Sequence, residues 1–91
     1  MRTTYDKIAD AKYIKISAKA SRRGVVARTE CLSDWLNIDY DKQGNVYGIE
    51  VLAASLHPVT VLVDQGSIVI REDSRRPVKP NLQAGRIPVA V

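Results

Sequence analysis

The sequence predicts a mainly β protein: an antiparallel sheet of five to seven short strands built from hairpins, with one short helical turn near residues 6–10. Two observations lead to this fold class. Apolar and polar side chains alternate with period two through most of the chain, which is typical of half-buried strands. Glycine-containing turns at residues 41–46 and 64–67 each join two such segments.

The expected strands follow one another along the chain and are separated by polar turns. Residues 6–10 form a tight or helical turn, in which the side chain of Asp6 can cap free amides. Residues 18–24 contain alanine, serine and glycine and are expected to form a loop. The expected strands cover residues 2–5, 11–17, 25–31, 35–41, 46–52, 59–63 and 68–71.

The first glycine-containing hairpin has a predictable register. If Asp41 and Val46 close a four-residue loop, the apolar side chains of both strands share one face, apart from Trp35 and the closing or terminal residues Val46 and Leu52. A slip by one residue would set apolar side chains against Gly48 and Glu50, so the first register is favoured. The expected pairs are Tyr40 with Tyr47, Ile38 with Ile49 and Leu36 with Val51.

Three side chains are candidates for an interface. Trp35 is the one large apolar residue that this register leaves on the wetter face, so it is either an isolated exposed aromatic or an anchor for a partner. In the second hairpin, pairing of Val63 with Ile68 leaves Leu62 and Val69 on the opposite face. Because both faces of that hairpin are apolar, we expect a homo-oligomer, most simply a dimer.

The basic charge of the chain is concentrated at its end. All ten acidic residues precede residue 74, together with ten of the fourteen basic residues, so the net charge of +4 lies within residues 74–91. The sequence therefore predicts one β-rich domain over residues 1–73 and a basic, proline-containing tail over 74–91. The tail either is solvated without a partner or binds a protein or a nucleic acid. The tail residues expected to bind a partner are Arg75, Arg76, Lys79, Leu82, Arg86, Ile87 and Val89.

The remaining composition favours a cytoplasmic protein. The single cysteine, Cys31, cannot form an internal disulfide, and no apolar run is long enough to cross a bilayer. The first residues lack the basic-then-apolar order of a secretory signal.

Three segments carry a family resemblance. Residues 5–14 read YDKIADAKYI, residues 27–30 read ARTE, and residues 39–55 read DYDKQGNVYGIEVLAAS. This order resembles the bacterial, archaeal and phage family called domain of unknown function 2283, over residues 3–55. Lys12 departs from the family's usual apolar residue, and residues 56–73 form an added hairpin beyond the resemblance. The resemblance implies a compact antiparallel β domain without known catalysis, and the toxin-like genes beside some family members imply an antitoxin-like role.

No set of side chains predicts catalysis or a cofactor. Asp39, Asp41, Gln43 and Glu50 have the spacing of an EF-hand calcium loop, but their flanks alternate as strands, so we expect an acidic β-turn. His57 and Cys31 lack further ligands at metal-binding spacing, and a buried thiol at the end of a strand is the simpler interpretation of Cys31. We therefore expect a non-enzymatic protein with no cofactor.

Two functions fit these features. The first is a protein-interaction module, antitoxin-like or accessory, whose C-terminal segment binds a partner. The alternative is a small nucleic-acid-binding protein that uses the basic tail and the loop at residues 19–28, which contains Lys19, Arg22, Arg23 and Arg28.

Overall fold

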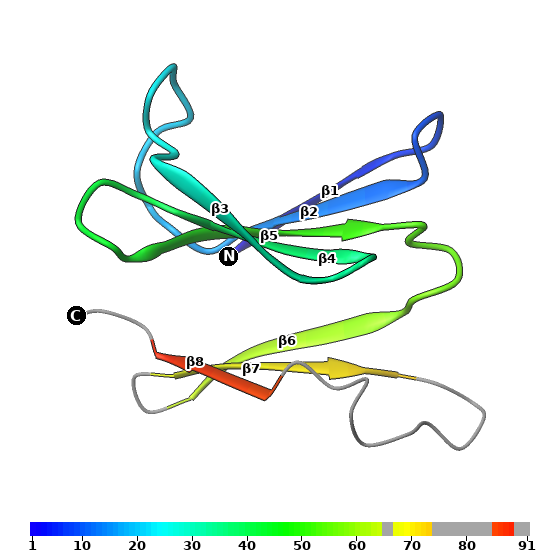
Figure 1. Ribbon diagram of the computed structural model, residues 1–91. Helices are drawn as coiled ribbons and strands as arrows, with labels where there is room; N and C mark the ends of the chain where they lie inside the picture. Colours follow the sequence, from blue (N-terminus) through cyan, green and yellow to red (C-terminus); the bar gives the residue numbers. More distant parts are fainter. Residues whose placement is uncertain (65–66, 74–84, 89–91) are drawn as a thin grey trace.

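The computed structural model describes residues 1–64, 67–73 and 85–88 and contains two antiparallel sheets stacked face to face (Figure 1). The mainly β, antiparallel fold predicted from the sequence is confirmed. The larger sheet has the strand order β1-β2-β5-β4-β3. Its strands are β1 (Arg2–Asp6), β2 (Ala11–Lys15), β3 (Arg28–Ser33), β4 (Leu36–Tyr40) and β5 (Val46–Leu52).

The smaller sheet has the order β6-β7-β8, with β6 at Val59–Asp64, β7 at Ser67–Glu72 and β8 at Gly85–Pro88. The pairing of Val63 with Ile68 is confirmed. The strand β8 lies within the segment that was predicted from the sequence to be a basic, proline-containing tail. It is compatible with Pro88 because β8 is an edge strand, where a missing backbone donor is tolerated.

The core lies between the two sheets and follows from the alternation of side chains. Every second residue of the central strands points toward the other sheet, and these positions carry branched aliphatic side chains. The core residues, none more than 6% exposed, are Ile14, Leu36, Ile38, Val46, Ile49, Val51, Val61, Ile68 and Ile70. No helix among the described residues has the length and apolar character needed to cross a membrane.

A β-bulge modifies the predicted register of the β4–β5 hairpin. Ile38 pairs with Ile49 as expected, but Tyr40 lies opposite Val46 rather than Tyr47, because the register shifts between Asp39 and Tyr40. The extra residue in β5 separates Tyr47 from the apolar cluster. The Tyr47 ring instead lies 5.7 Å from the Lys15 amine.

The turn between β1 and β2 contains no helix, so of the two forms expected from the sequence, a tight turn or a helical turn, it has the first. Asp6 caps it as predicted, because its Oδ1 accepts hydrogen bonds from the amides of Ile8 at 2.9 Å and Ala9 at 3.1 Å. Asp10 then adopts a φ of 49°, a left-handed conformation that prevents the turn from continuing as a helix.

Trp35 packs against the core, so the expectation that it faces away from the core was wrong. It precedes β4, next to a register shift between Cys31 and Ser33, and the alternation of β4 does not extend to it. Its ring stacks on His57 with centroids 4.3 Å apart, and His57 Nδ1 lies 2.7 Å from Glu72 Oε2. These contacts connect the larger sheet to the smaller one.

Cys31 is exposed, so the expectation of a buried thiol was also wrong. It lies in β3, which is an edge strand of the larger sheet. All residues of β3 are exposed, and none of them belongs to the core cluster. The alternation of apolar and polar residues predicted a buried face for this strand. It could not show that the whole strand lies beyond the part of the larger sheet that the core covers.

Candidate anion-binding site

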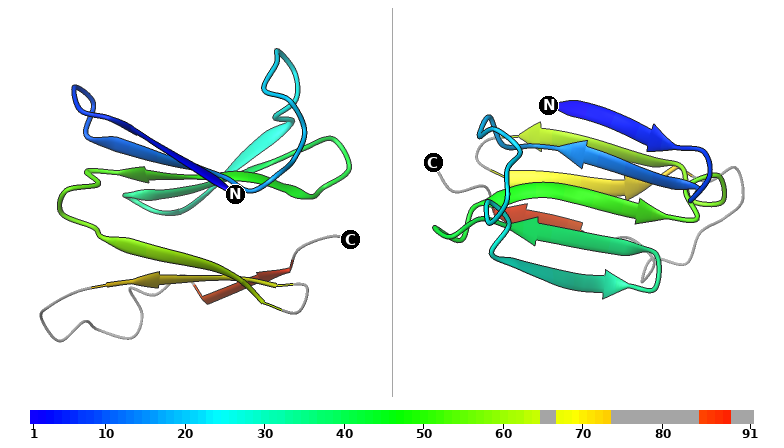
Figure 2. Two further views of the ribbon diagram at one scale, coloured as in Figure 1. Left: turned by 180° about the vertical axis from the view of Figure 1, so that it is seen from behind. Right: turned by 90° about the horizontal axis from the view of Figure 1, so that it is seen from above.

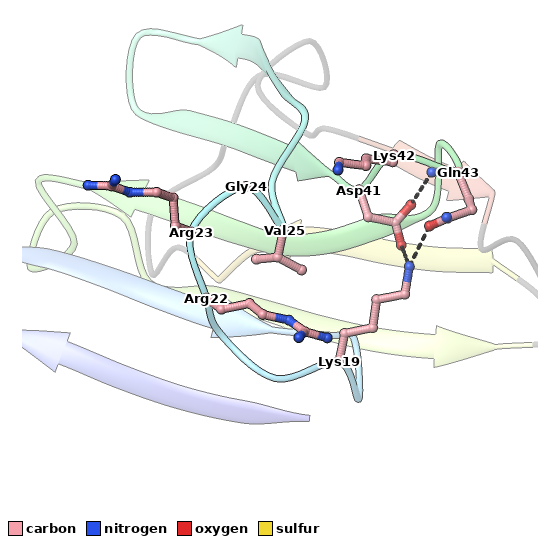
Figure 3. Close-up of a pocket in the computed structure, with 8 residues that line it drawn as sticks. All are labelled: Lys19, Arg22, Arg23, Gly24, Val25, Asp41, Lys42 and Gln43. Atoms are coloured by element: carbon pink, nitrogen blue, oxygen red, sulfur yellow. Dashed lines mark hydrogen bonds and ion pairs between the residues drawn. The ribbon is translucent and has the colours of Figure 1, made fainter.

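A recess of about 340 Å³ lies between the loop that follows β2 and the turn between β4 and β5 (Figure 3). Figure 2 shows this loop crossing the end of the larger sheet, from the end of β2 to the start of β3. We call this recess the basic pocket, because four of its residues carry a cationic side chain and one a carboxylate. It is lined by Lys19, Arg22, Arg23, Gly24, Val25, Asp41, Lys42 and Gln43.

The turn side of the basic pocket is held by Asp41. The buried Asp41 carboxylate accepts hydrogen bonds from the amides of Gln43 and Asn45, both at 2.9 Å. Its carbonyl oxygen accepts the amide of Gly44 at 3.0 Å, and Gly44 supplies the φ of 83° that the turn requires. The turn is therefore fixed by its own side chain.

The loop side is anchored at two points. The Lys19 amine donates to Asp41 Oδ2 at 2.7 Å and to Gln43 Oε1 at 2.5 Å, which joins the loop to the turn. Ser21 Oγ lies 2.8 Å from the Tyr47 hydroxyl, and the Tyr47 carbonyl accepts the amide of Ser17 at 3.0 Å. Tyr47 is buried but lies outside the apolar cluster between the sheets, and its hydroxyl and carbonyl groups hold the loop in place.

The charges of the basic pocket are unbalanced. The hydrogen bond and the positive charge of Lys19 lower the pKa of Asp41, so the carboxylate and Lys19 form a pair of their own. Within the part of the chain that the structure describes, Arg22, Arg23 and Lys42 form no ion pair. In Figure 3, Arg22 and Lys42 lie on opposite sides of Val25. A recess with uncompensated cations favours an anionic ligand.

The C-terminal residues proposed from the sequence contribute little to the described structure. Arg75, Arg76, Lys79, Leu82 and Val89 lie outside the described residues. Arg86 and Ile87 belong to β8, opposite Val69 and Ile68 in the register. Leu62 faces Val69 across β6 and β7, and its side chain is 51% exposed. An interface at Leu62 and Val69 stays a prediction.

The cations of the loop were predicted from the sequence, but Lys42 and the role of Asp41 were not. A loop that joins β2 to β3 must pass the β4–β5 turn once β2 pairs with β5, since both lie at the same end of the sheet. If the pairing of β2 with β5 had been known, Lys42 and Asp41 would have been predicted to lie beside the loop. The strand order itself could not be inferred from the sequence.

Residues of the first family-like segment form a hydrogen-bond network that supports the fold. Asp10 accepts hydrogen bonds from the Tyr5 hydroxyl at 2.6 Å and from the amide and hydroxyl of Ser55 at 3.0 and 2.6 Å. The bond from the Ser55 hydroxyl, followed by that from Tyr5, lowers the pKa of the Asp10 carboxyl. These contacts tie the β1–β2 turn to the end of β5.

The acidic residues with calcium-loop spacing are also used by the fold. Asp39 accepts the hydroxyls of Tyr13 at 2.7 Å and Thr29 at 2.6 Å, and Glu50 accepts the amide group of Asn37 at 3.1 Å. The burial of Tyr13 and its bond to Asp39 raise its pKa. The hairpin expected in place of an EF-hand is confirmed. The described residues contain no group of three or more potential metal ligands from His, Cys, Asp or Glu.

Comparison with known families identifies one match. The family described as "Protein of unknown function (DUF2283)" matches residues 2–55. The chain belongs to this family. No curated protein and no solved structure matches the chain. The family-like residues Tyr5, Asp10, Asp39, Asp41 and Ser55 hold turns and strands together, whereas Arg22 and Arg23 lie between the family-like segments.

Proposed function

We propose that this protein is a small, non-catalytic, nucleic-acid-binding protein and that the basic pocket contacts the phosphate backbone. The observation that supports this proposal most directly is the placement of Arg22, Arg23 and Lys42 around an anchored recess, without acidic partners among the described residues. Arginine and lysine are the usual phosphate ligands of nucleic-acid-binding proteins.

The anchoring of the loop strengthens this proposal. Lys19, Ser21 and Tyr47 hold the loop through contacts made in the free protein. A binding site that is already ordered loses less conformational entropy when its ligand binds. The net charge of +4 that the sequence carries within residues 74–91 adds to the long-range attraction of the protein for a polyanion.

The protein-interaction alternative has less support from the described residues. It depends on a free C-terminal segment, but Gly85–Pro88 pairs with β7 of the same chain. The other residues assigned to partner binding lie outside the described part. An antitoxin-like role therefore stays a prediction from the sequence and the family resemblance.

Neutralisation of the basic pocket should weaken nucleic-acid binding. In the double variant Arg22→Gln/Lys42→Gln, we expect affinity for a fluorescent oligonucleotide to fall by about tenfold or more at low salt, since about 1.4 kcal/mol corresponds to a factor of ten. The slope of log affinity against log salt should decrease in magnitude by about 0.7 for each single-strand phosphate that the variant no longer neutralises. Fluorescence anisotropy across a salt series measures both quantities.

The control is Lys7→Gln/Arg71→Gln, which removes the same kinds of charge from exposed positions outside the basic pocket. It should change affinity by less than about twofold, because only the long-range charge is altered. Equal decreases in both double variants, or no binding by the unmodified protein, would contradict the proposal.

A further inference from the structure

A second cationic recess, of about 230 Å³, opens on the outer face of the larger sheet. Its walls come from β1, β2 and the loop that follows β2, and the lining residues are Arg2, Thr4, Tyr13, Lys15 and Ser21. No acidic side chain among the described residues lines this recess. Its two cations come from neighbouring strands.

The two cations are directly opposed. Arg2 lies across from Lys15 in the β1–β2 register, and Thr4 lies across from Tyr13 on the same face. Like charges in directly opposite positions destabilise a sheet. No carboxylate among the described residues pairs with either of them, and the Lys15 amine is engaged only with the face of the Tyr47 ring. A bound anion would relieve this repulsion.

The two recesses adjoin the same loop. Ser21 lines the second recess and Arg22, the next residue, lines the basic pocket. The Cα atoms of these two consecutive residues are about 3.8 Å apart. A ligand that contacts both recesses therefore has only this loop to pass. The hydrogen bond between Ser21 and Tyr47 keeps the loop between them.

We infer that the ligand is a single-stranded nucleic acid, with one phosphate in the basic pocket and another between Arg2 and Lys15. This inference rests on the proposed function and names its ligand more closely. A ligand backbone that reaches both recesses follows the loop at Ser21 and Arg22, which separates them. A single strand is flexible enough to follow a loop of this size, whereas double-stranded DNA has a persistence length of about 150 base pairs and resists bending.

Probe length separates the two phosphate positions. The probes are fluorescent oligothymidylates of about two and about twelve nucleotides, the longer of which lies within common single-strand site sizes. In Arg2→Gln/Lys15→Gln, affinity for the longer probe should fall by about five- to tenfold, as expected when a charge-assisted hydrogen bond is removed. Affinity for the shorter probe, which occupies the basic pocket alone, should stay within about twofold. Thermal unfolding of each variant checks that the fold is kept.

The possible results test the second phosphate position, the single-strand assignment and the proposed function separately. If Arg2→Gln/Lys15→Gln binds the longer probe like the unmodified protein while Arg22→Gln/Lys42→Gln does not, the second phosphate position is wrong and the proposed function stands. If a duplex of the same length binds as tightly as the single strand, the single-strand assignment is wrong. If no probe binds the unmodified protein, the proposed function itself fails. The inference is supported if Arg2→Gln/Lys15→Gln binds the longer probe more weakly but the shorter probe as before, and if the unmodified protein binds the duplex more weakly than the single strand.

Discussion

Replacement of Ile49 by alanine should remove much of the stability of this protein. Ile49 is 0% exposed and lies on the central strand β5, directly between Ile14 on β2 and Ile38 on β4. Truncation of a buried isoleucine to alanine typically costs about 2–5 kcal/mol, because apolar packing is removed and a cavity remains. The total stability of a domain of this size is on the order of 5–10 kcal/mol. Urea unfolding followed by circular dichroism gives the difference.

The matched control is Ile8→Ala, which deletes the same atoms from a side chain that is 100% exposed. Its free energy of unfolding should change by less than about 0.5 kcal/mol, as is usual for surface substitutions. Equal effects of the two substitutions would mean that the larger sheet does not bury Ile49 as described.

Replacement of Gly48 by alanine should also destabilise the fold, although it adds only one methyl group. A Cβ atom at this position would overlap the phenol group of Tyr13, which crosses over Gly48 to donate its hydrogen bond to Asp39. Tyr13 must then move, and overpacking of this kind costs about 1–3 kcal/mol. Removal of the ring by Tyr13→Ala in the same chain should make the Gly48→Ala substitution nearly neutral.

The double-mutant cycle provides the test, because the coupling between residues 48 and 13 should be about as large as the cost of Gly48→Ala alone. An additive cycle would contradict the close approach of the Tyr13 ring to Gly48. A glycine in a strand interior often marks such a close approach. Gly48 is visible in the sequence as a glycine within a strand, but the sequence does not show that Tyr13 is the side chain that approaches it.

Local patterns predicted the hairpins and their registers well. The pairs Ile38–Ile49 and Val63–Ile68 follow from the alternation of apolar residues, because a slip of one residue would expose the core face. The same reasoning failed at Tyr47 and Trp35, which lie at or beside register shifts. A bulge changes the face of a side chain without changing the composition of the strand.

The candidate site was less predictable because it depends on contacts between distant segments. The cations of the loop are visible in the sequence, but their junction with Lys42 requires the pairing of β2 with β5, and the opposition of Arg2 and Lys15 requires the β1–β2 register. The polar residues of the family-like segments are explained by the fold. The role of the C-terminal residues proposed from the sequence stays a prediction.

The most direct test of the central claim is a titration of the isotopically labelled protein with a single-stranded oligonucleotide, followed by amide chemical shifts. We expect the largest shifts at Lys19, Gly24, Lys42 and Gln43, which line the basic pocket. Shifts confined to the smaller sheet, around Leu62 and Val69, or no shifts at low salt, would contradict the assignment of the basic pocket as the nucleic-acid-binding site.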